Sequence, residues 1–290
     1  LAVAVRLPDG TITVDKKPIK SIMQKVPFLK LPILRGVVAF FESMVIGIQT
    51  LMYSAQFFDI EDEEGSAPSK FDLWLEKVAG DKLKDYILYF SMILSLFIGV
   101  GLFMLLPTAL VGMVKRLTTN SIVFNLVEGG VRLSIFVIYI WAISKMKDIQ
   151  RVFQYHGAEH KTIFCYENGE ELTVENVRKN PRLHPRCGTS FLLIVMVVSI
   201  LLFALLPMYD EWWKRMLTRL ALLPLVAGVS YEILKWAGKN LANPFVAATC
   251  KPGMWLQKLT TREPDDAQIE VAICALKNVL SDNREDDRWS

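Results

Sequence analysis

Two of the three histidines in the chain lie four residues apart, in an H-x-x-E-H pattern that places Glu159 between His156 and His160. Residues four apart share one face of a helix, so the two imidazoles can reach one cation. Two ligands do not complete a zinc site, which takes three protein ligands when it is catalytic and four when it is structural. The same residue order occurs in inverzincin peptidases, where the glutamate activates the attacking water. The pattern therefore predicts a metal site with Glu159 as the general base.

Further ligands are expected from a second short run, in which His184 and Cys187 stand three residues apart. All the histidine in the 290 residues falls within a window of about thirty, which also holds Cys165 and Cys187. Clustered nitrogen and sulfur donors favour zinc or another divalent metal. The alternative is that the histidines cap helices or pair with acidic neighbours on a solvated surface.

Several charged residues near these runs are candidates for supporting roles. Arg186 or Lys161 could neutralise negative charge developing on a substrate or hold a lipid phosphate. The acidic cluster Glu263, Asp265 and Asp266 follows two threonines and precedes an apolar run, which is how a helix begins, so capping explains most of it. The alternative is an oxygen ligand or a carboxylate that orients a histidine.

The elements that must position these residues are mostly apolar. Hydrophobic residues make up 52% of the chain and the mean hydropathy is +0.31, which indicates a membrane protein. Segments 86–114, 121–144, 190–206 and 217–237 are close to or above the roughly 17 to 25 residues that cross a bilayer as a helix. We expect a mainly α, polytopic membrane protein with about four transmembrane helices and a short N-terminal hairpin that turns at Asp9-Gly10.

A fifth apolar segment, 33–58, carries polar residues at intervals of seven: Arg35, Glu42, Gln49 and Gln56. These form one stripe on a helix and should face protein. The stripe is either a seam that bonds to neighbouring helices or, through Glu42, the lining of a polar cavity. We predict a re-entrant or interfacial helix here, because the lysine-rich arm before it then stays cytoplasmic.

Basic residues flank the H-x-x-E-H segment on both sides, which places that segment and the C-terminus in the cytoplasm. The predicted organisation is an N-terminal cytoplasmic arm with a hairpin (1–32), a re-entrant or interfacial helix (33–58), an acidic linker with a short helix (59–85), a transmembrane hairpin (86–145), the cytoplasmic H-x-x-E-H segment (146–186), a second transmembrane hairpin (187–238) and a cytoplasmic C-terminal segment (239–290).

Two carboxylates lie inside the apolar segments, where a charge is costly and is usually paired or functional. Glu128 has Arg132 four residues on, and Glu232 has Lys235 three residues on, so intrahelical pairing is the structural explanation for both. The net charge of +3 is spread over loops, which gives no support for nucleic-acid binding. The four cysteines form no C-x-x-C pair and are expected to be reduced in the cytoplasm.

The chain resembles the YqhQ-like bacterial membrane proteins, a family of unknown function described as predicted metal-dependent enzymes. The residues that carry the resemblance are 35–43, 146–149, 155–161, 183–191 and 261–266. It implies a bacterial cytoplasmic membrane protein with a metal centre at His156 and His160, and His184 as a further ligand candidate. It names no reaction.

The leading hypothesis is a zinc-dependent hydrolase at the cytoplasmic membrane surface, with Glu159 as base and Arg186 as the group that stabilises negative charge. Its partners would be membrane lipid and a membrane-borne peptide or lipid substrate, since a soluble substrate gives no reason to station the site there.

Two alternatives remain open. One is a structural metal that clamps the cytoplasmic segment through four ligands, His156, His160, His184 and Cys187. The other is an ion transporter or channel that uses the intramembrane carboxylates Glu42, Glu128 and Glu232. The oligomeric state is not predicted.

Overall fold

The computed structural model describes residues 1–57, 83–112, 120–207, 209, 211–240 and 243–281 and is mainly helical. The predicted acidic linker with a short helix, 59–85, lies almost entirely outside the described residues. In chain order the elements are β1 (Ala2–Arg6), β2 (Ile12–Lys16), the 3-10 helices η1 (Ile22–Gln24) and η2 (Pro27–Lys30), α1 (Leu34–Ala55), α3 (Leu83–Val100), the π-helix η4 (Gly101–Leu105), α4 (Leu106–Gly112), α5 (Ser121–Ile143), α6 (Lys147–Glu167), α7 (Val174–Lys179), α8 (Gly188–Ala204), α9 (Trp212–Lys239), α10 (Pro244–Thr260) and α11 (Asp266–Lys277).

The predicted N-terminal hairpin is confirmed. Strands β1 and β2 pair antiparallel, with Val5 opposite Thr13. Gly10 has φ +87°, a conformation that glycine adopts without strain, and the Asp9 carboxylate accepts from the main chain of Thr11. Arg6 of β1 forms an ion pair with Glu270 of α11 at 2.6 Å. The hairpin therefore rests against the C-terminal helix.

Within the described residues, four helical stretches are long and apolar enough to cross a membrane: Leu34–Ser54, Tyr89–Gly112, Ser121–Ile143 and Trp212–Lys239. Three of them correspond to predicted transmembrane helices. The fourth lies in α1, which we expected to be re-entrant or interfacial and which is one unbroken helix. Helix α8, over the predicted 190–206 segment, has 17 residues and is shorter than these four. The number of candidate spans agrees with the prediction, but the set differs: the helix at 34–54 is among them and the shorter helix α8 is not.

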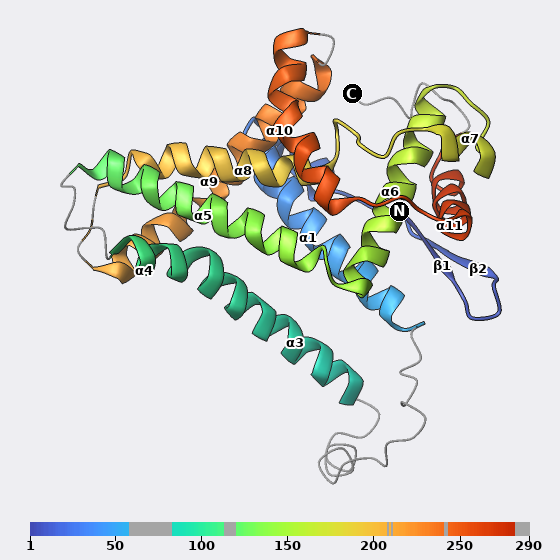
Figure 1. The fold of residues 1–290 in the computed structure, drawn as a ribbon, viewed down its shortest axis with the longest axis horizontal. Coiled ribbons are helices and arrows are strands. Elements are labelled where there is room, and N and C mark those ends of the chain that lie inside the picture. The colour runs from blue at the N-terminus through green and yellow to red at the C-terminus, as the bar shows by residue number, and fades with distance from the viewer. Residues whose placement is uncertain (58–82, 113–119, 208, 210, 241–242, 282–290) are drawn as a thin grey trace.

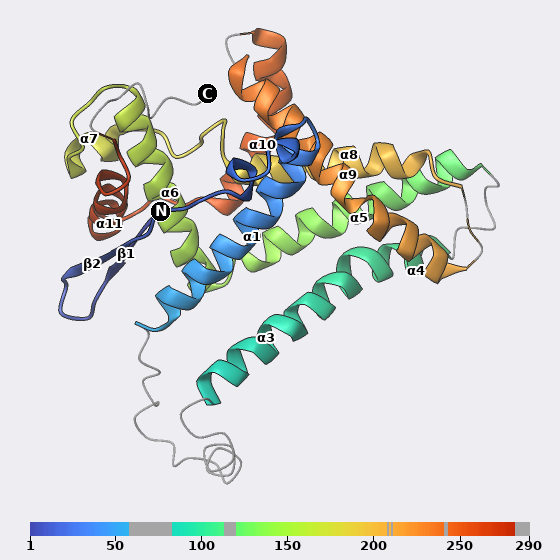
Figure 2. The same ribbon diagram turned by 180° about the vertical axis from the view of Figure 1, so that it is seen from behind.

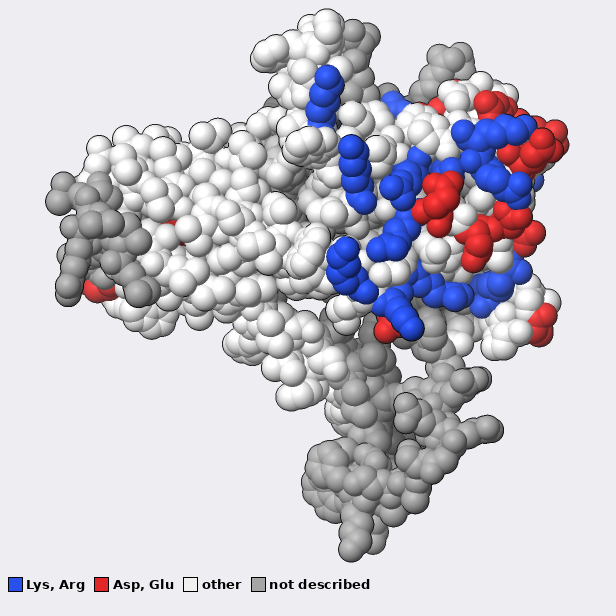
Figure 3. All heavy atoms as spheres, viewed as in Figure 1, with Lys and Arg blue, Asp and Glu red and all other residues white. Residues whose placement is uncertain are grey.

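The apolar helices form one body and the charged elements gather at one end of it. Figures 1 and 2 show α4 beside the start of α9 at one end, and α6, α7 and α11 at the other end. On the face drawn in Figure 3, lysine, arginine, aspartate and glutamate cluster over α6, α7 and α11, while the surface over α5 and α8 is almost free of charge. This distribution is the one that a membrane-embedded body with one polar end would have.

The charged end has its own small core. Ala158 and Cys165 of α6 pack with Val177 of α7 and with Ile269 and Ile273 of α11. The residues of α6 are seven apart and those of α11 four apart, so each pair lies on one face of its helix, and their burial with Val177 fixes the three helices against one another. This core holds α6 in place.

Helix α1 docks on α9 through glycines and an ion pair. A Cβ on Gly36 would lie 2.6 Å from the Tyr231 Cβ, so only glycine allows this approach. Arg35 donates two hydrogen bonds to the Glu232 carboxylate, one of them at 2.7 Å. Glu232 therefore pairs with Arg35 rather than mainly with Lys235, the partner expected from the sequence.

Glu42 is also bonded to protein, because its carboxylate accepts from the Ser21 hydroxyl at 3.0 Å and from the Ile22 main chain at 2.7 Å. Arg35 and Glu42 are thus hydrogen-bonded to protein, as the seam interpretation expects, whereas Gln49 and Gln56 of the same predicted stripe are exposed.

Glu128 is fully buried between α5, α4 and α9. The expected partner Arg132 lies 3.4 Å away, but Arg219 of α9 is the main partner, with two hydrogen bonds to the carboxylate. Arg132 also donates to the Phe103 carbonyl at 3.0 Å, in the π-helix η4. The pairing that dominates at Glu128 is therefore between helices and not within α5.

Candidate metal centre

Helix α6 carries the H-x-x-E-H pattern and presents both histidines on one face. The helix ends at Glu167, after which Gly169 adopts φ +77° and turns the chain. The ring centroids of His156 and His160 are 4.4 Å apart. The spacing of four residues therefore brings the two imidazoles together as expected.

The third member of the cluster is Cys187, which follows α7 and forms the N-cap of α8. Its sulfur accepts from the Thr189 main chain at 3.4 Å. His156 Nε2 lies 3.1 Å from Cys187 Sγ. One donor atom from each of His156, His160 and Cys187 lies within 4.8 Å of the others, which is close enough for the three to bind one ion.

Both imidazoles are oriented by main-chain carbonyls. His156 Nδ1 lies 2.8 Å from the Thr260 carbonyl at the end of α10. His160 Nδ1 lies 2.5 Å from the Arg182 carbonyl in the segment before α8. When the Nδ1–H of a histidine donates a hydrogen bond to a carbonyl, the tautomer is fixed and the lone pair of Nε2 is available to a metal ion. This is the usual arrangement of a metal-binding histidine.

Gly157 makes the first of these contacts possible. A Cβ at this position would lie 2.1 Å from the Arg262 carbonyl oxygen, so any other residue would push the α10–α11 connection away. The connection is also bonded to α6 directly, because the Arg262 main chain donates to the Phe153 carbonyl at 2.8 Å. Gly157 is therefore the position at which α6 and the α10–α11 connection approach each other closely.

The imidazoles and the Cys187 thiol shift one another's pKa values. Burial raises the pKa of Cys187, but hydrogen bonds from His156 and His160 outweigh it and lower the pKa to about 5. Burial lowers the pKa of His156, and the hydrogen bond and charge of Cys187 reverse this and raise it above its usual value. A thiolate is the form of cysteine that binds metals, so Cys187 is prepared for that role.

His184 is close to the cluster but is engaged elsewhere. Its ring centroid is 5.8 Å from that of His160, its Nε2 lies 3.4 Å from the Glu167 carboxylate, and its Nδ1 accepts from the Arg186 main chain at 3.3 Å. Burial is the main reason why its pKa lies below the usual value. The structure thus brings together three of the four proposed ligands and leaves His184 with other partners.

Gln257 of α10 holds the main chain around His184 in place, a role that the sequence pattern does not predict. It is fully buried, accepts from the His184 main-chain N–H at 2.8 Å and donates to the His184 carbonyl at 2.8 Å. In a third hydrogen bond, the Gln257 side-chain amide donates to the Ser190 hydroxyl at 3.2 Å. A glutamine in an apolar helix face is the one signal that could have pointed to this role, since a buried amide needs partners.

A cavity of about 430 Å³ opens in front of the cluster. Its lining includes His156, His160 and Cys187 together with Glu159, Glu167 and Arg186. Glu159 is exposed, as a residue must be if it meets a substrate. The predicted base therefore faces the same space as the three donor atoms.

The other predicted charged residues have structural partners. Arg186 is paired with Glu167 at the wall of the cavity. Lys161 is buried and bonds to the Arg178 carbonyl and to Glu263.

The remaining two acids of the predicted cluster serve helix α11. Asp265 is its N-cap and forms a reciprocal capping box with Gln268, while Asp266 pairs with Arg178. Capping therefore accounts for Asp265, and none of the three acids belongs to the cluster of donor atoms.

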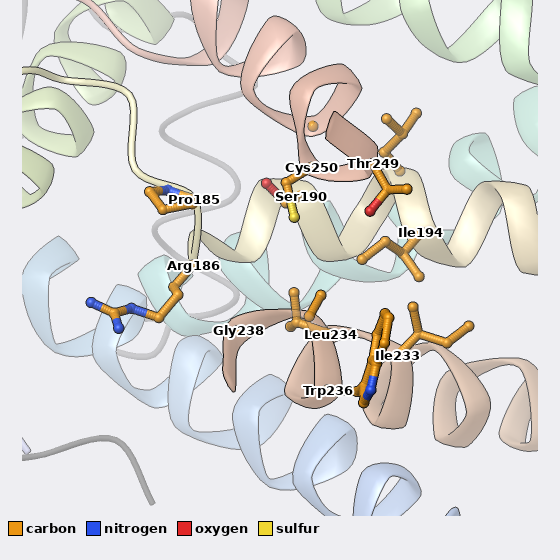
Figure 4. A pocket seen from close by; sticks show the side chains of 13 residues that line it. Pro185, Arg186, Ser190, Ile194, Ile233, Leu234, Trp236, Gly238, Thr249 and Cys250 are labelled. Atoms are coloured by element: carbon orange, nitrogen blue, oxygen red, sulfur yellow. The ribbon is translucent and has the colours of Figure 1, made fainter. Parts of the chain in front are cut away.

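A second, smaller cavity of about 120 Å³ lies between α8, α9 and α10 and shares Arg186 with the first. Figure 4 shows Ile194, Ile233 and Trp236 around this space, with the Arg186 guanidinium extending away from them. An apolar recess thus adjoins the polar cavity.

Comparison with known proteins places the chain among uncharacterised relatives. Residues 31–282 match the family described as "Protein of unknown function (DUF1385)". The chain is 36% identical over 283 residues to "Uncharacterized protein YqhQ" of Bacillus subtilis (strain 168). The aligned residues cover 96% of this chain and 86% of that protein. No solved structure matches.

Proposed function

The chain belongs to the family described as "Protein of unknown function (DUF1385)", and we propose that it is a zinc-dependent hydrolase of the bacterial cytoplasmic membrane. The proposed substrate is a membrane-borne peptide or lipid, reached at the cytoplasmic face.

One observation carries the proposal: His156, His160 and Cys187 bring their donor atoms within 4.8 Å of one another beside a cavity. Two imidazoles and a thiolate are a donor set that zinc accepts, and three protein ligands are the number typical of catalytic zinc. The carbonyl partners of both Nδ1 atoms add the outer support that such sites have.

When bound, zinc would supply Lewis acidity and lower the pKa of a water in the cavity to near neutrality. Glu159 faces the cavity and would take the proton from the attacking water and later return it to the leaving group. Arg186 lies at the wall, held by Glu167, and would interact with negative charge on the substrate.

The position of the site supports a membrane-borne substrate. Cys187 is the N-cap of the apolar helix α8, so the donor atoms lie where the charged end of the molecule meets the apolar body. The apolar recess that shares Arg186 offers space for a hydrophobic part of the substrate. Basic residues on both sides of the segment favour the cytoplasmic face.

The two alternatives receive less support. A structural site would need a fourth ligand, and His184, the proposed one, is bonded to Glu167 and to the Arg186 main chain. A cation path would need available carboxylates, and Glu128 and Glu232 are each paired with arginine.

Metal content tests the site itself. Elemental analysis of the purified chain should give one zinc, none in His160→Ala, and one in the matched control His184→Ala. Loss of zinc in both variants would favour the four-ligand structural site, and absence of metal from the unaltered chain would refute the proposal.

Activity tests the reaction. The chain, loaded with zinc and reconstituted in vesicles of bacterial membrane lipid and protein, should release products detectable by mass spectrometry. Glu159→Gln should retain zinc and lose about a hundredfold or more in rate, the usual contribution of a general base. Glu170→Gln, on the turn after α6, is the control that should keep its rate. Equal rates in the two variants would exclude Glu159 as the base.

A further inference from the structure

The cluster around Glu128 contains more positive than negative charge. Arg132, Arg215 and Arg219 all approach this one carboxylate, with Arg215 Nη1 at 3.9 Å. All four side chains are at most 8% exposed. Since arginine does not deprotonate in proteins, the described residues of the cluster hold two positive charges in excess.

Glu128 is hydrogen-bonded to three other side chains. Arg219 donates to both carboxylate oxygens, and the Thr108 hydroxyl donates at 2.7 Å. Arg132 is bonded to Glu128 and to the Phe103 carbonyl. Arg215 Nη1, at 3.9 Å from Glu128 Oε2, lies beyond hydrogen-bond distance of this carboxylate.

Of the three arginines, Arg215 is the one that forms no hydrogen bond to Glu128. Its Nε and Nη1 are buried and have no hydrogen-bond partner among the described residues. Its Cζ lies 5.4 Å from the centroid of the Phe124 ring, a contact that compensates only part of the cost of burying a charge. A buried guanidinium with two unsatisfied nitrogens, 3.9 Å from an already bonded carboxylate, favours the binding of an additional anion.

A cavity of about 340 Å³ lies where that anion would bind. Arg215, Arg219 and Thr108 supply its polar lining, and Leu105, Trp212 and Met216 are among its apolar residues. The cavity is at the end of the bundle formed by α4 and the start of α9, opposite the end that carries α6 (Figures 1 and 2). It is thus separate from the candidate metal centre.

We propose that this cavity binds the phosphate group of an anionic phospholipid. The planar fork of arginine matches phosphate with two parallel hydrogen bonds. Trp212 and Trp213, both exposed at the start of α9, mark the level of the membrane interface, and Arg215 lies one turn inside it. The apolar lining suits a lipid better than a free ion, and Leu105 and Leu110 are exposed on the surface nearby. The inference rests on the membrane placement of α4, α5 and α9 proposed above.

Lipid binding to the full chain in detergent, measured by native mass spectrometry, tests the site. Phosphatidylglycerol should bind more tightly than zwitterionic phosphatidylcholine. Arg215→Gln should weaken binding of phosphatidylglycerol about tenfold or more, the loss expected for charge-assisted hydrogen bonds. Lys214→Gln, the same change of charge at the adjacent exposed position, should bind as the unaltered chain does.

Other outcomes would overturn the proposal. Equal binding by Arg215→Gln and Lys214→Gln, or equal binding of the two lipids, would show that the cavity does not select an anionic lipid. Competition by inorganic phosphate as strong as that of the lipid would assign the site to a soluble phosphate.

If Arg215→Gln does not fold, Arg215→Lys keeps the charge and removes the fork, and it should still weaken binding of phosphatidylglycerol. The zinc content of the variants separates this proposal from the proposed function, because the metal centre lies at the other end of the bundle.

Discussion

Replacing Gly157 by alanine tests whether the close approach of two segments maintains the metal centre. The new Cβ would lie 2.1 Å from the Arg262 carbonyl, where ordinary contacts begin at 3.4 Å, so the α10–α11 connection must retreat by more than an ångström. Such overpacking costs about 1–3 kcal/mol, and the lost hydrogen bond between Arg262 and Phe153 costs about 1 kcal/mol more. Alanine returns about 1 kcal/mol through its higher helix propensity. We expect the free energy of unfolding to fall by about 1–3 kcal/mol.

The same retreat should draw the Thr260 carbonyl away from His156 and weaken zinc binding about 10–100-fold. The assays are unfolding in detergent and competition for zinc with a chelator of known affinity. Gly130→Ala is the matched control, because that helical glycine has nothing within 4 Å of an added Cβ and should gain up to about 1 kcal/mol. If Gly157→Ala is as stable as Gly130→Ala and binds zinc normally, the close approach does not support the site.

Three further changes have defined expectations. Glu128→Gln leaves buried guanidiniums without their counter-charge and should reduce the free energy of unfolding by about 3–5 kcal/mol. Glu175→Gln, in an exposed ion pair, is the control and should change the free energy of unfolding by less than about 0.5 kcal/mol. Similar effects of the two changes would mean that Glu128 does not neutralise the arginines. Asp265→Ala removes a helix cap and should cost about 0.5–2 kcal/mol in the same measurement without loss of zinc, and loss of zinc would make Asp265 a ligand instead. The pKa of Cys187 is lowered from 9.0 to about 5, so the thiolate stabilises the metal-free fold fully above about pH 9, and this stabilisation is lost as the pH falls through about 5. The free energy of unfolding, measured at a series of pH values, should show this loss in the unaltered chain and not in Cys187→Ser.

The part of the site that follows helical periodicity could be predicted from the sequence. His156 and His160 are four residues apart on a helix, and their convergence needs no knowledge of the rest of the fold. Cys187 and His184 lie on a segment without regular structure, where spacing does not define a face. Both contact α6, and which of them joins His156 and His160 as a donor depends on tertiary contacts, among them the bonds of Gln257 to the His184 main chain.

The charged residues of the apolar helices show the same limit. The i, i+4 relation predicted that Arg132 contacts Glu128, and it does. The stronger partner Arg219 is 91 residues away, and the partner of Glu232 is 197 residues away in α1. Periodicity locates a charge on a helix, but only the packing of helices decides which charges meet.

The π-helix η4 sets the angular position of everything that follows it in α4. A π turn contains one residue more than the α-helix around it, and each residue rotates an α-helix by about 100°. Deleting one residue between Gly101 and Leu105 would turn Thr108 away from Glu128 and withdraw the Phe103 carbonyl from Arg132. A single-residue change in chain length at this point would therefore disconnect the buried charges without altering any of them.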